Sequence, residues 1–328
     1  MTEAASITLA RITAGIVCAF GATVLAWEFL RYMTVLPGDA AVAIAVELPL
    51  LVIGGWAARR LRPVHPPPLI WSAAAIIWGA AAAAGCALLA NEGLGGLWAR
   101  SAGPAFAATW SASLSAPLNE ELLKVCGVVM VVLAAPQVIR GPLDGMIVGA
   151  LTGLGFQAAE NVTYGLNAVA LHGALDPASA ILSSAGYRIE VTGLGSHWAM
   201  TAVAGAGVGY VVRRGRSGLP PALACLLAAM AMHALFDAPY VPVLAKVGVN
   251  LATVAVFYLV LRHEYMARAH GFLAGQVAAG TLSSSQAADL VSRFCRRRSV
   301  RQATSGTKRA AVRAGQQQAL EELDIAAA

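Results

Sequence analysis

The sequence has little charge for its length. Only 12% of its 328 residues are Asp, Glu, Lys or Arg, about half of the roughly 25% that is usual in soluble domains. Hydrophobic residues make up 58% of the chain, and the mean hydropathy is +0.67. The apolar runs are long and do not alternate with polar residues, which excludes a membrane β-barrel and favours transmembrane helices.

The sequence also lacks paired cysteines. No CxxC motif is present, and four of the five cysteines fall in apolar runs, where a cysteine usually packs as a small buried hydrophobe. This excludes a disulfide framework and a cysteine metal site. The net charge of +6 comes from loops and from the C-terminal tail. That distribution fits an anionic lipid surface better than nucleic acid, which we do not expect as a partner.

The apolar runs are long enough to cross a bilayer, whose core of about 30 Å requires roughly 20 residues per helix. The predicted fold is all-α, a polytopic transmembrane helical bundle of about eight spans. The spans are expected at 7–29, 39–58, 69–90, 117–135, 143–170, 188–212, 219–239 and 241–262. Residues 98–116 are expected to form a re-entrant or interfacial segment; if they span instead, the topology after them inverts. The first segment shows no cleavage site and is interpreted as a retained span.

The distribution of basic residues predicts the orientation. Basic clusters occur at 59–63, at 213–216 and after Arg262, whereas the opposite loops contain single arginines at positions 31, 100 and 188. Because Lys and Arg accumulate in cytoplasmic loops, both termini are expected in the cytoplasm. The chain is then a multi-pass protein of a bacterial cell membrane.

The composition changes after residue 262. We expect a transmembrane domain over 1–262 and a short cytoplasmic tail over 263–328, made of polar, partly disordered helices. The serines at 283–285 are a helix N-cap signal. The arginines at 296–298 are expected either to contact anionic lipid head groups or to form a solvated charged face.

Several ionisable residues lie inside the predicted spans, where each costs about 2.5–3.5 kcal/mol and usually marks function. Four spans contain them, together with one adjacent amide: Glu120, Glu121, Lys124, Glu160, Asn161, His197, His233 and Asp237. Glu47, a lone carboxylate with no motif around it, is interpreted as structural. At 1.5 Å per residue, the alternating directions of the four spans bring these groups to one layer in the outer half of the membrane. We therefore expect a single site.

The spacing of these residues suits hydrolytic chemistry. Glu120 and Lys124 are four residues apart in the favourable order, and so are His233 and Asp237. Two histidines with carboxylates and room for water are the donors of a catalytic zinc site. Each element has a plainer interpretation, since a charged helix face, a packing histidine or a structural ion pair would look the same. Their common depth favours the functional interpretation.

These motifs together resemble one protein family. "EELLK" (120–124), "DGMIVGALTGLGFQAAENVTYG" (144–165), "GSHWAMTAVAGAGVGY" (195–210) and "HALFDAP" (233–239) look like the PrsW family of intramembrane proteases, which is related to the CAAX prenyl endopeptidases. Order and spacing match across roughly 117–240. Some members have the motif FExxE. In this chain Gln157 replaces the first glutamate of that motif, so no carboxylate role is expected at position 157.

The resemblance implies an intramembrane metalloprotease that hydrolyses a membrane protein near the extracytoplasmic side, with site-1 cleavage of a single-span anti-sigma factor as one form. It implies Glu120 or Glu121 as general base, and His197 and His233, with Glu160 or Asp237, as zinc ligands or as groups that polarise water without metal. Lys124 would tune the carboxylates, and Asn161 would donate to the tetrahedral intermediate. The alternatives are a proton-coupled carrier, whose site would lie nearer the midplane, and a CAAX-type prenyl endopeptidase, whose EExxxR motif this chain lacks.

Overall fold

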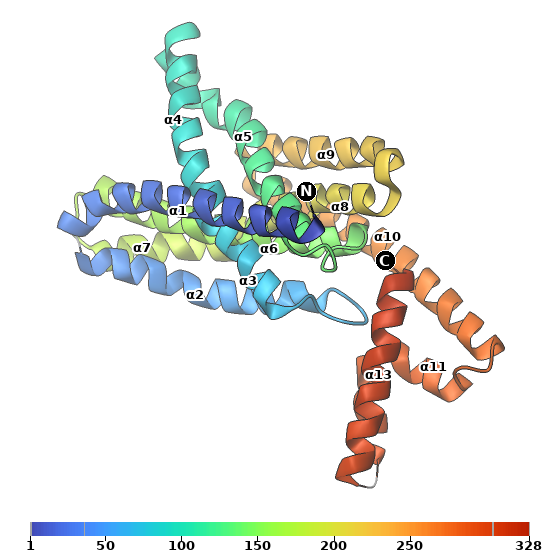
Figure 1. Cartoon of the computed structure of the whole chain (residues 1–328). Helices are drawn as coiled ribbons and strands as arrows, with labels where there is room; N and C mark the ends of the chain where they lie inside the picture. The colour runs from blue at the N-terminus through green and yellow to red at the C-terminus, as the bar shows by residue number, and fades with distance from the viewer. Residues whose placement is uncertain (1, 36, 304, 328) are drawn as a thin grey trace.

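The computed structural model describes residues 2–35, 37–303 and 305–327, and within them every regular element is a helix (Figure 1). The predicted all-α fold is confirmed. The elements are α1 (Glu3–Val35), α2 (Pro37–Arg60), α3 (Leu69–Ile77), η1 (Trp78–Ala83), α4 (Ala84–Ser101), α5 (Pro104–Ala134), α6 (Pro142–Leu171), α7 (Pro177–Gly186), η2 (Tyr187–Thr192), η3 (Gly193–Gly195), α8 (His197–Arg214), η4 (Gly215–Gly218), α9 (Leu219–Asp237), α10 (Val243–Ala278), α11 (Ser284–Val291), α12 (Arg293–Gln302) and α13 (Gly306–Ala327).

Several of these helices are long and apolar enough to cross a bilayer, so the chain is a multi-pass membrane protein. By length and composition the described residues contain five such segments: Glu3–Leu30, Gly38–Arg60, Leu69–Ser101, Pro177–Asp237 and Val243–Ala278. Helices α5 and α6 lie between them and contain the charged residues of the predicted site. The set of eight spans stays a prediction.

The segment 98–116 forms the tip of a helical hairpin, and its expected re-entrant or interfacial placement stays a prediction. Helix α4 ends at Ser101 and α5 begins at Pro104, well before the predicted span start at 117. Gly103 makes the tight turn with a φ of 96°, which favours glycine, and Pro104 occupies the first turn of α5. The Trp98 indole donates to Ser115 Oγ at 2.9 Å and ties the two arms together. Figure 1 shows this hairpin projecting from the bundle.

Helix α6 is the central helix, and every residue from Pro142 to Ala158 is buried. It approaches α8 closely through three glycines spaced four residues apart. A Cβ at Gly145, Gly149 or Gly153 would lie 2.2–2.3 Å from a backbone carbonyl oxygen of α8. The three carbonyls belong to Gly205, Thr201 and His197, in that order. Small residues at this spacing allow two membrane helices to pack backbone to backbone, and here they fix the position of His197.

The path from α7 to α8 is a broken helix. The predicted span 188–212 contains a π-helix, η2, and then a short 3-10 turn, η3, before α8 begins at His197. The free carbonyls at the break are satisfied by side chains: Gly193 O accepts from the Trp198 indole at 3.0 Å, and Gly195 O accepts from Asn250 Nδ2 at 2.8 Å. Irregular backbone at membrane depth is tolerated where protein satisfies it in this way. His197 therefore stands at the first position of a helix.

The C-terminal helices pack against α10 and bond the loop that follows α2. Helix α10 continues through the expected boundary at 262 to Ala278, and α11, α12 and α13 follow. Ser283 caps α11 with a full capping box, as its sequence signal predicts. Asp324 of α13 is buried and accepts from Arg62 at 3.1 Å and from the Tyr265 hydroxyl at 2.5 Å. Arg62 also pairs with Asp144 at 2.7 Å, in the first turn of α6.

The backbone contact between α6 and α8 can be tested by adding one methyl group. In Gly149→Ala the new Cβ would meet Thr201 O at 2.2 Å, so we expect the helices to separate and the protein to lose about 1–3 kcal/mol of stability. The matched control is Gly248→Ala on α10, where a Cβ would meet nothing within 4 Å; it should be neutral or slightly stabilising. Thermal unfolding in detergent measures both, and equal unfolding midpoints would contradict the close packing.

Candidate active site

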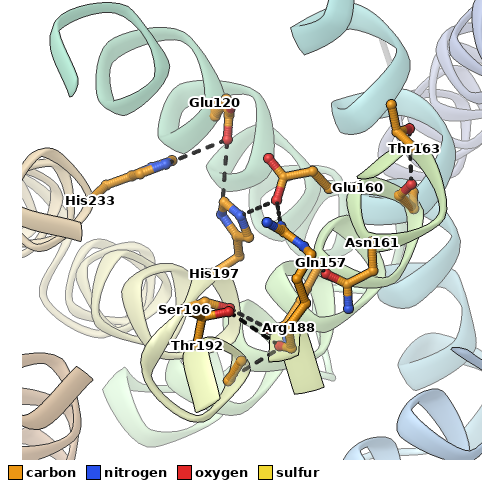
Figure 2. Close-up of polar contacts among 12 residues, drawn as sticks. Glu120, Gln157, Glu160, Asn161, Thr163, Arg188, Thr192, Ser196, His197 and His233 are labelled. Atoms are coloured by element: carbon orange, nitrogen blue, oxygen red, sulfur yellow. Dashed lines mark hydrogen bonds and ion pairs between the residues drawn. The ribbon is translucent and has the colours of Figure 1, made fainter. Parts of the chain in front are cut away.

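The residues predicted to share a site do come together. Glu120, Glu121 and Lys124 lie on α5, Glu160 and Asn161 on α6, His197 at the start of α8, and His233 and Asp237 at the end of α9. Hydrogen bonds and ion pairs connect them into one network, part of which is drawn in Figure 2. The cluster is therefore built from four helices that are far apart in the sequence.

Glu121 is the most enclosed carboxylate of the network. It is fully buried, and it is bonded to three groups: Lys124 Nζ at 2.6 Å, His233 Nδ1 at 2.9 Å and the Thr201 hydroxyl at 3.1 Å. A buried carboxylate needs such partners, because an uncompensated charge is very unfavourable away from water. Its oxygens are thus already occupied by the protein.

Glu120 differs from its neighbour. Its Oε1 accepts from Asn91 Nδ2 of α4 at 2.8 Å, but its Oε2 is buried and accepts no hydrogen bond. That oxygen lies 3.9 Å from His197 Nδ1 and 3.7 Å from His233 Nε2 (Figure 2). Buried acceptors without a donor are uncommon and often belong to functional sites. Glu120 Oε2 therefore faces the centre of the cluster.

Each histidine is held from its outer side by a carboxylate. Glu121 Oε1 lies 2.9 Å from His233 Nδ1, and Glu160 Oε2 lies 2.9 Å from His197 Nε2. A carboxylate accepts hydrogen bonds, so each pairing places the proton on the outer ring nitrogen and fixes the tautomer. The inner nitrogens, His233 Nε2 and His197 Nδ1, both face Glu120 Oε2, and His197 Nδ1 accepts from Lys124 Nζ at 3.0 Å.

Lys124 supplies the positive charge at the centre. Its Nζ lies 2.6 Å from Glu121 Oε1, 3.0 Å from His197 Nδ1 and 3.7 Å from Glu120 Oε2. The ammonium also lies 4.4 Å from the centroid of the Phe156 ring, which packs against His197 as well. Such cation–π contact favours a desolvated cation. Lys124 therefore compensates the two glutamates and donates to the inner nitrogen of His197.

The structure adds Arg188 and Glu47 to the site, which the sequence did not indicate. Arg188, expected in an outer loop, lies in η2, and its guanidinium donates to Glu160 Oε2 (Figure 2). It also donates to Asn161 Oδ1 and stacks on the Tyr164 ring. Asn161 Nδ2 donates in turn to Glu47 Oε2 at 3.0 Å. The one sequence signal that could have indicated Arg188 was its position at the end of a predicted span, close to a site with more carboxylates than basic groups.

Asp237 and Glu160 form the accessible side of the site. Their side chains are 23% and 24% exposed, whereas Glu120, Glu121, Lys124 and both histidines are almost fully buried. Asp237 Oδ2 lies 3.4 Å from His233 Nε2. Glu160 is held by both Arg188 and His197, so Asp237 is the less restrained of the two carboxylates.

The centre of this cluster fits a metal ion. Glu120, His197 and His233 each present a ligand atom, and these atoms lie within 4.8 Å of one another. Two imidazoles and one carboxylate are a donor set typical of catalytic zinc. Both histidines of this group were among the predicted ligands, but its carboxylate is Glu120. Glu160, a predicted ligand, instead contacts the outer nitrogen of His197. Lys124 Nζ would have to release His197 Nδ1 for the metal to bind.

Comparison with known protein families supports the same conclusion. The model of the PrsW family of intramembrane metalloproteases matches residues 67–262, which is more than half of the chain and includes all of α5, α6, α8 and α9. No curated protein and no solved structure matches the chain.

Competition between Lys124 and a metal ion predicts that one substitution raises the affinity for zinc and another lowers it. Lys124→Met removes the ammonium next to His197 and Glu120, where charges about 4 Å apart interact by about 4 kcal/mol at an effective dielectric constant of 20. We expect zinc affinity to rise at least about tenfold in this variant. His197→Ala should lower it about a hundredfold or more, since even outer contacts to metal ligands are worth about 10–100-fold.

Zinc titration of detergent-purified protein against a competing chelator measures both effects. Lys308→Met, on the exposed surface of α13, is the matched control and should bind zinc like the wild type. Weaker zinc binding by Lys124→Met would show that the ammonium supports the ion instead of competing with it.

Proposed function

This chain belongs to the PrsW family of intramembrane metalloproteases, and on that premise we propose that it cleaves a membrane-protein substrate near the extracytoplasmic side of the membrane. Family membership makes the chain a peptide hydrolase, which replaces the carrier considered from the sequence. The observation that carries the proposal is the convergence of two imidazole nitrogens, from His197 and His233, on Glu120 Oε2, a buried oxygen that accepts no hydrogen bond.

We assign the metal to Glu120, His197 and His233, and zinc fits their nitrogen and oxygen donors best. A zinc ion bound there would polarise the scissile carbonyl and lower the pKa of a bound water. Glu121 and Glu160 hold the two imidazoles in the required tautomers from outside. Arg188 in turn orients Glu160, and Asn161 and Glu47 hold Arg188.

Asp237 is the proposed general base. Its carboxylate is partly exposed and lies beside His233 Nε2, so it can receive a proton from a water in front of the cluster. Glu121, one of the two bases considered from the sequence, is bonded to three groups and is unsuited to that role. Glu120 is better used as a ligand. A base positioned within hydrogen-bond reach contributes about 10²–10⁴-fold to such reactions.

Lys124 is the proposed stabiliser of the developing oxyanion. Its ammonium stands at the centre of the cluster, and once released from His197 it can donate to a negatively charged oxygen. Asn161 was the other donor considered, but both ends of its amide are engaged, by Glu47 and by Arg188. We therefore assign Asn161 a positioning role.

The outward position of the site supports cleavage near the extracytoplasmic side. Glu160 lies about 27 Å along α6 from Pro142, and His233 about 21 Å along α9 from Leu219, at 1.5 Å per residue. Both helices begin at the end of the bundle where the basic clusters 59–63 and 213–216 are located. By the positive-inside rule that end is cytoplasmic in a bacterial cell membrane. A single-span protein with an extracytoplasmic domain, such as an anti-sigma factor, suits this geometry.

Cleavage assays separate the proposed roles. Asp237→Asn should lose cleavage about a hundredfold or more and keep its zinc, because only the proton acceptor is removed. Glu120→Gln and His233→Ala should lose both zinc and cleavage. The substrate is a tagged single-span anti-sigma factor, followed by immunoblot in co-expressing membranes and after purification, with zinc measured by elemental analysis.

Glu264→Gln is the control substitution of a carboxylate by an amide, since Glu264 lies outside the cluster and forms an ion pair with Arg268 on α10. It should cleave at the wild-type rate. Wild-type cleavage by Asp237→Asn would overturn the assignment of the base, and wild-type cleavage by His233→Ala would overturn the active site itself.

The orientation can be tested with a pair of single cysteines. Leu175 follows α6 and is 91% exposed, and Ser217 lies in η4 at the other end of α8. In intact cells a membrane-impermeant thiol reagent should label Leu175→Cys and spare Ser217→Cys until the membrane is opened. The reverse pattern would place the active site on the cytoplasmic side.

A further inference from the structure

A second polar feature lies at the opposite end of the bundle from the active site. A cleft of about 550 Å³ separates the end of α2 from helices α12 and α13, and we call it the tail cleft. Its walls include six arginines: Arg59 and Arg60 from α2, Arg296, Arg297 and Arg301 from α12, and Arg313 from α13. All residues of its lining lie outside the segment 67–262 that matches the protease family.

The tail cleft has a large excess of positive charge. No acidic residue lines it, and the carboxylates of Glu321 and Asp324 line only a smaller cavity beside it. Among the described residues no ion pair involves Arg60, Arg297, Arg301 or Arg313. From Asp289 to Glu321 the intervening sequence contains eight basic residues and no acidic one. Arginines brought together in this way without counter-charges repel one another unless an anion binds.

One wall of the tail cleft lies at the membrane surface. Arg59 and Arg60 are the last residues of the candidate span Gly38–Arg60. One turn earlier Trp56 is 58% exposed and stacks under the Arg60 guanidinium. Tryptophan and arginine at the end of a span are typical of the head-group layer. Further along the same helix Val52 and Ile53 are 70% and 63% exposed, which provides an apolar surface for an acyl chain.

We propose that the tail cleft binds the phosphate of an acidic phospholipid, with its acyl chains lying along the exposed face of α2. The planar guanidinium groups suit this ligand because each can donate two parallel hydrogen bonds to phosphate oxygens. The apolar path beside the cleft favours a lipid over a soluble phosphate. The bound lipid links α2 to α12 and α13, across the position where Arg62 already joins Asp144 to Asp324.

The test uses the full-length protein, purified in an uncharged detergent and stripped of lipid. Phosphatidylglycerol, phosphatidylcholine and glycerol phosphate are titrated separately, and binding is followed by the unfolding midpoint and by lipid adducts in native mass spectrometry. We expect phosphatidylglycerol to bind and to raise the midpoint, whereas the other two should have little effect.

A triple variant, Arg60→Gln with Arg301→Gln and Arg313→Gln, should bind phosphatidylglycerol about a hundredfold more weakly. Each arginine near an anionic lipid surface contributes about fivefold to affinity. The matched control, Arg298→Gln with Lys308→Gln and Arg309→Gln, removes the same charge from α12 and α13 without altering the cleft lining. Its affinity should change by no more than about threefold.

Four outcomes would overturn the proposal. Equal weakening by both triple variants would mean that lipid follows overall charge and not the cleft. Equal binding of phosphatidylcholine would mean that the phosphate charge is not recognised. Equal binding of glycerol phosphate would identify the ligand as a soluble phosphate. Unchanged phosphatidylglycerol adducts on the cleft variant would place the lipid elsewhere, even if that variant unfolds earlier.

Discussion

The compensation of buried charge by Lys124 is the interaction on which the site depends. Glu120, Glu121 and Lys124 are almost completely buried on one helix, where each uncompensated ion would cost several kcal/mol. Lys124 pairs with Glu121 and His197, Glu121 with His233 and Thr201, and His197 with Glu160. Each charge is therefore stabilised by residues of other helices, and the network forms only when those helices are packed. One buried oxygen of Glu120 remains without a donor, and the proposed metal site is centred on it.

This network requires short distances that ordinary helix packing would not give. Two helices usually pack at about 8–10 Å between their axes, but the glycines of α6 let the carbonyls of α8 approach to where a Cβ would collide. Because the helix is broken at 193–196, α8 begins at His197. The imidazole therefore projects from the end of a helix instead of from its side. Gln157 contributes here too: it bonds Ser196 and the Gly193 carbonyl. An amide at the position where some relatives have a carboxylate thus supports the break that positions His197.

The sequence predicted the helical fold and the composition of the site because both follow from local and additive properties. Hydropathy defines helices, and the depth of a residue along a helix follows from its position in the sequence. The different environments of Glu120 and Glu121 could not be predicted, because they depend on which neighbours each one faces. Adjacent residues differ by about 100° around a helix, and only the packed structure shows Asn91 beside one and His233 beside the other. The contribution of Arg188 depends on a π-helical segment that apolar periodicity does not reveal.

Helix α6 contributes residues both to the buried cluster of Arg62, Asp144 and Asp324 and to the candidate active site. Near its first turn Asp144 pairs with Arg62, which also holds Asp324 of the last helix. Toward its other end Glu160 bonds both Arg188 and the outer nitrogen of His197, and Asn161 bonds Arg188 as well. Between them α6 is buried along its length and contacts α8 backbone to backbone. A helix held in this way at both ends and along its length leaves little room for displacement, because a packed interior resists small deformations. The C-terminal helices and the carboxylate that orients His197 are therefore anchored to the same buried helix.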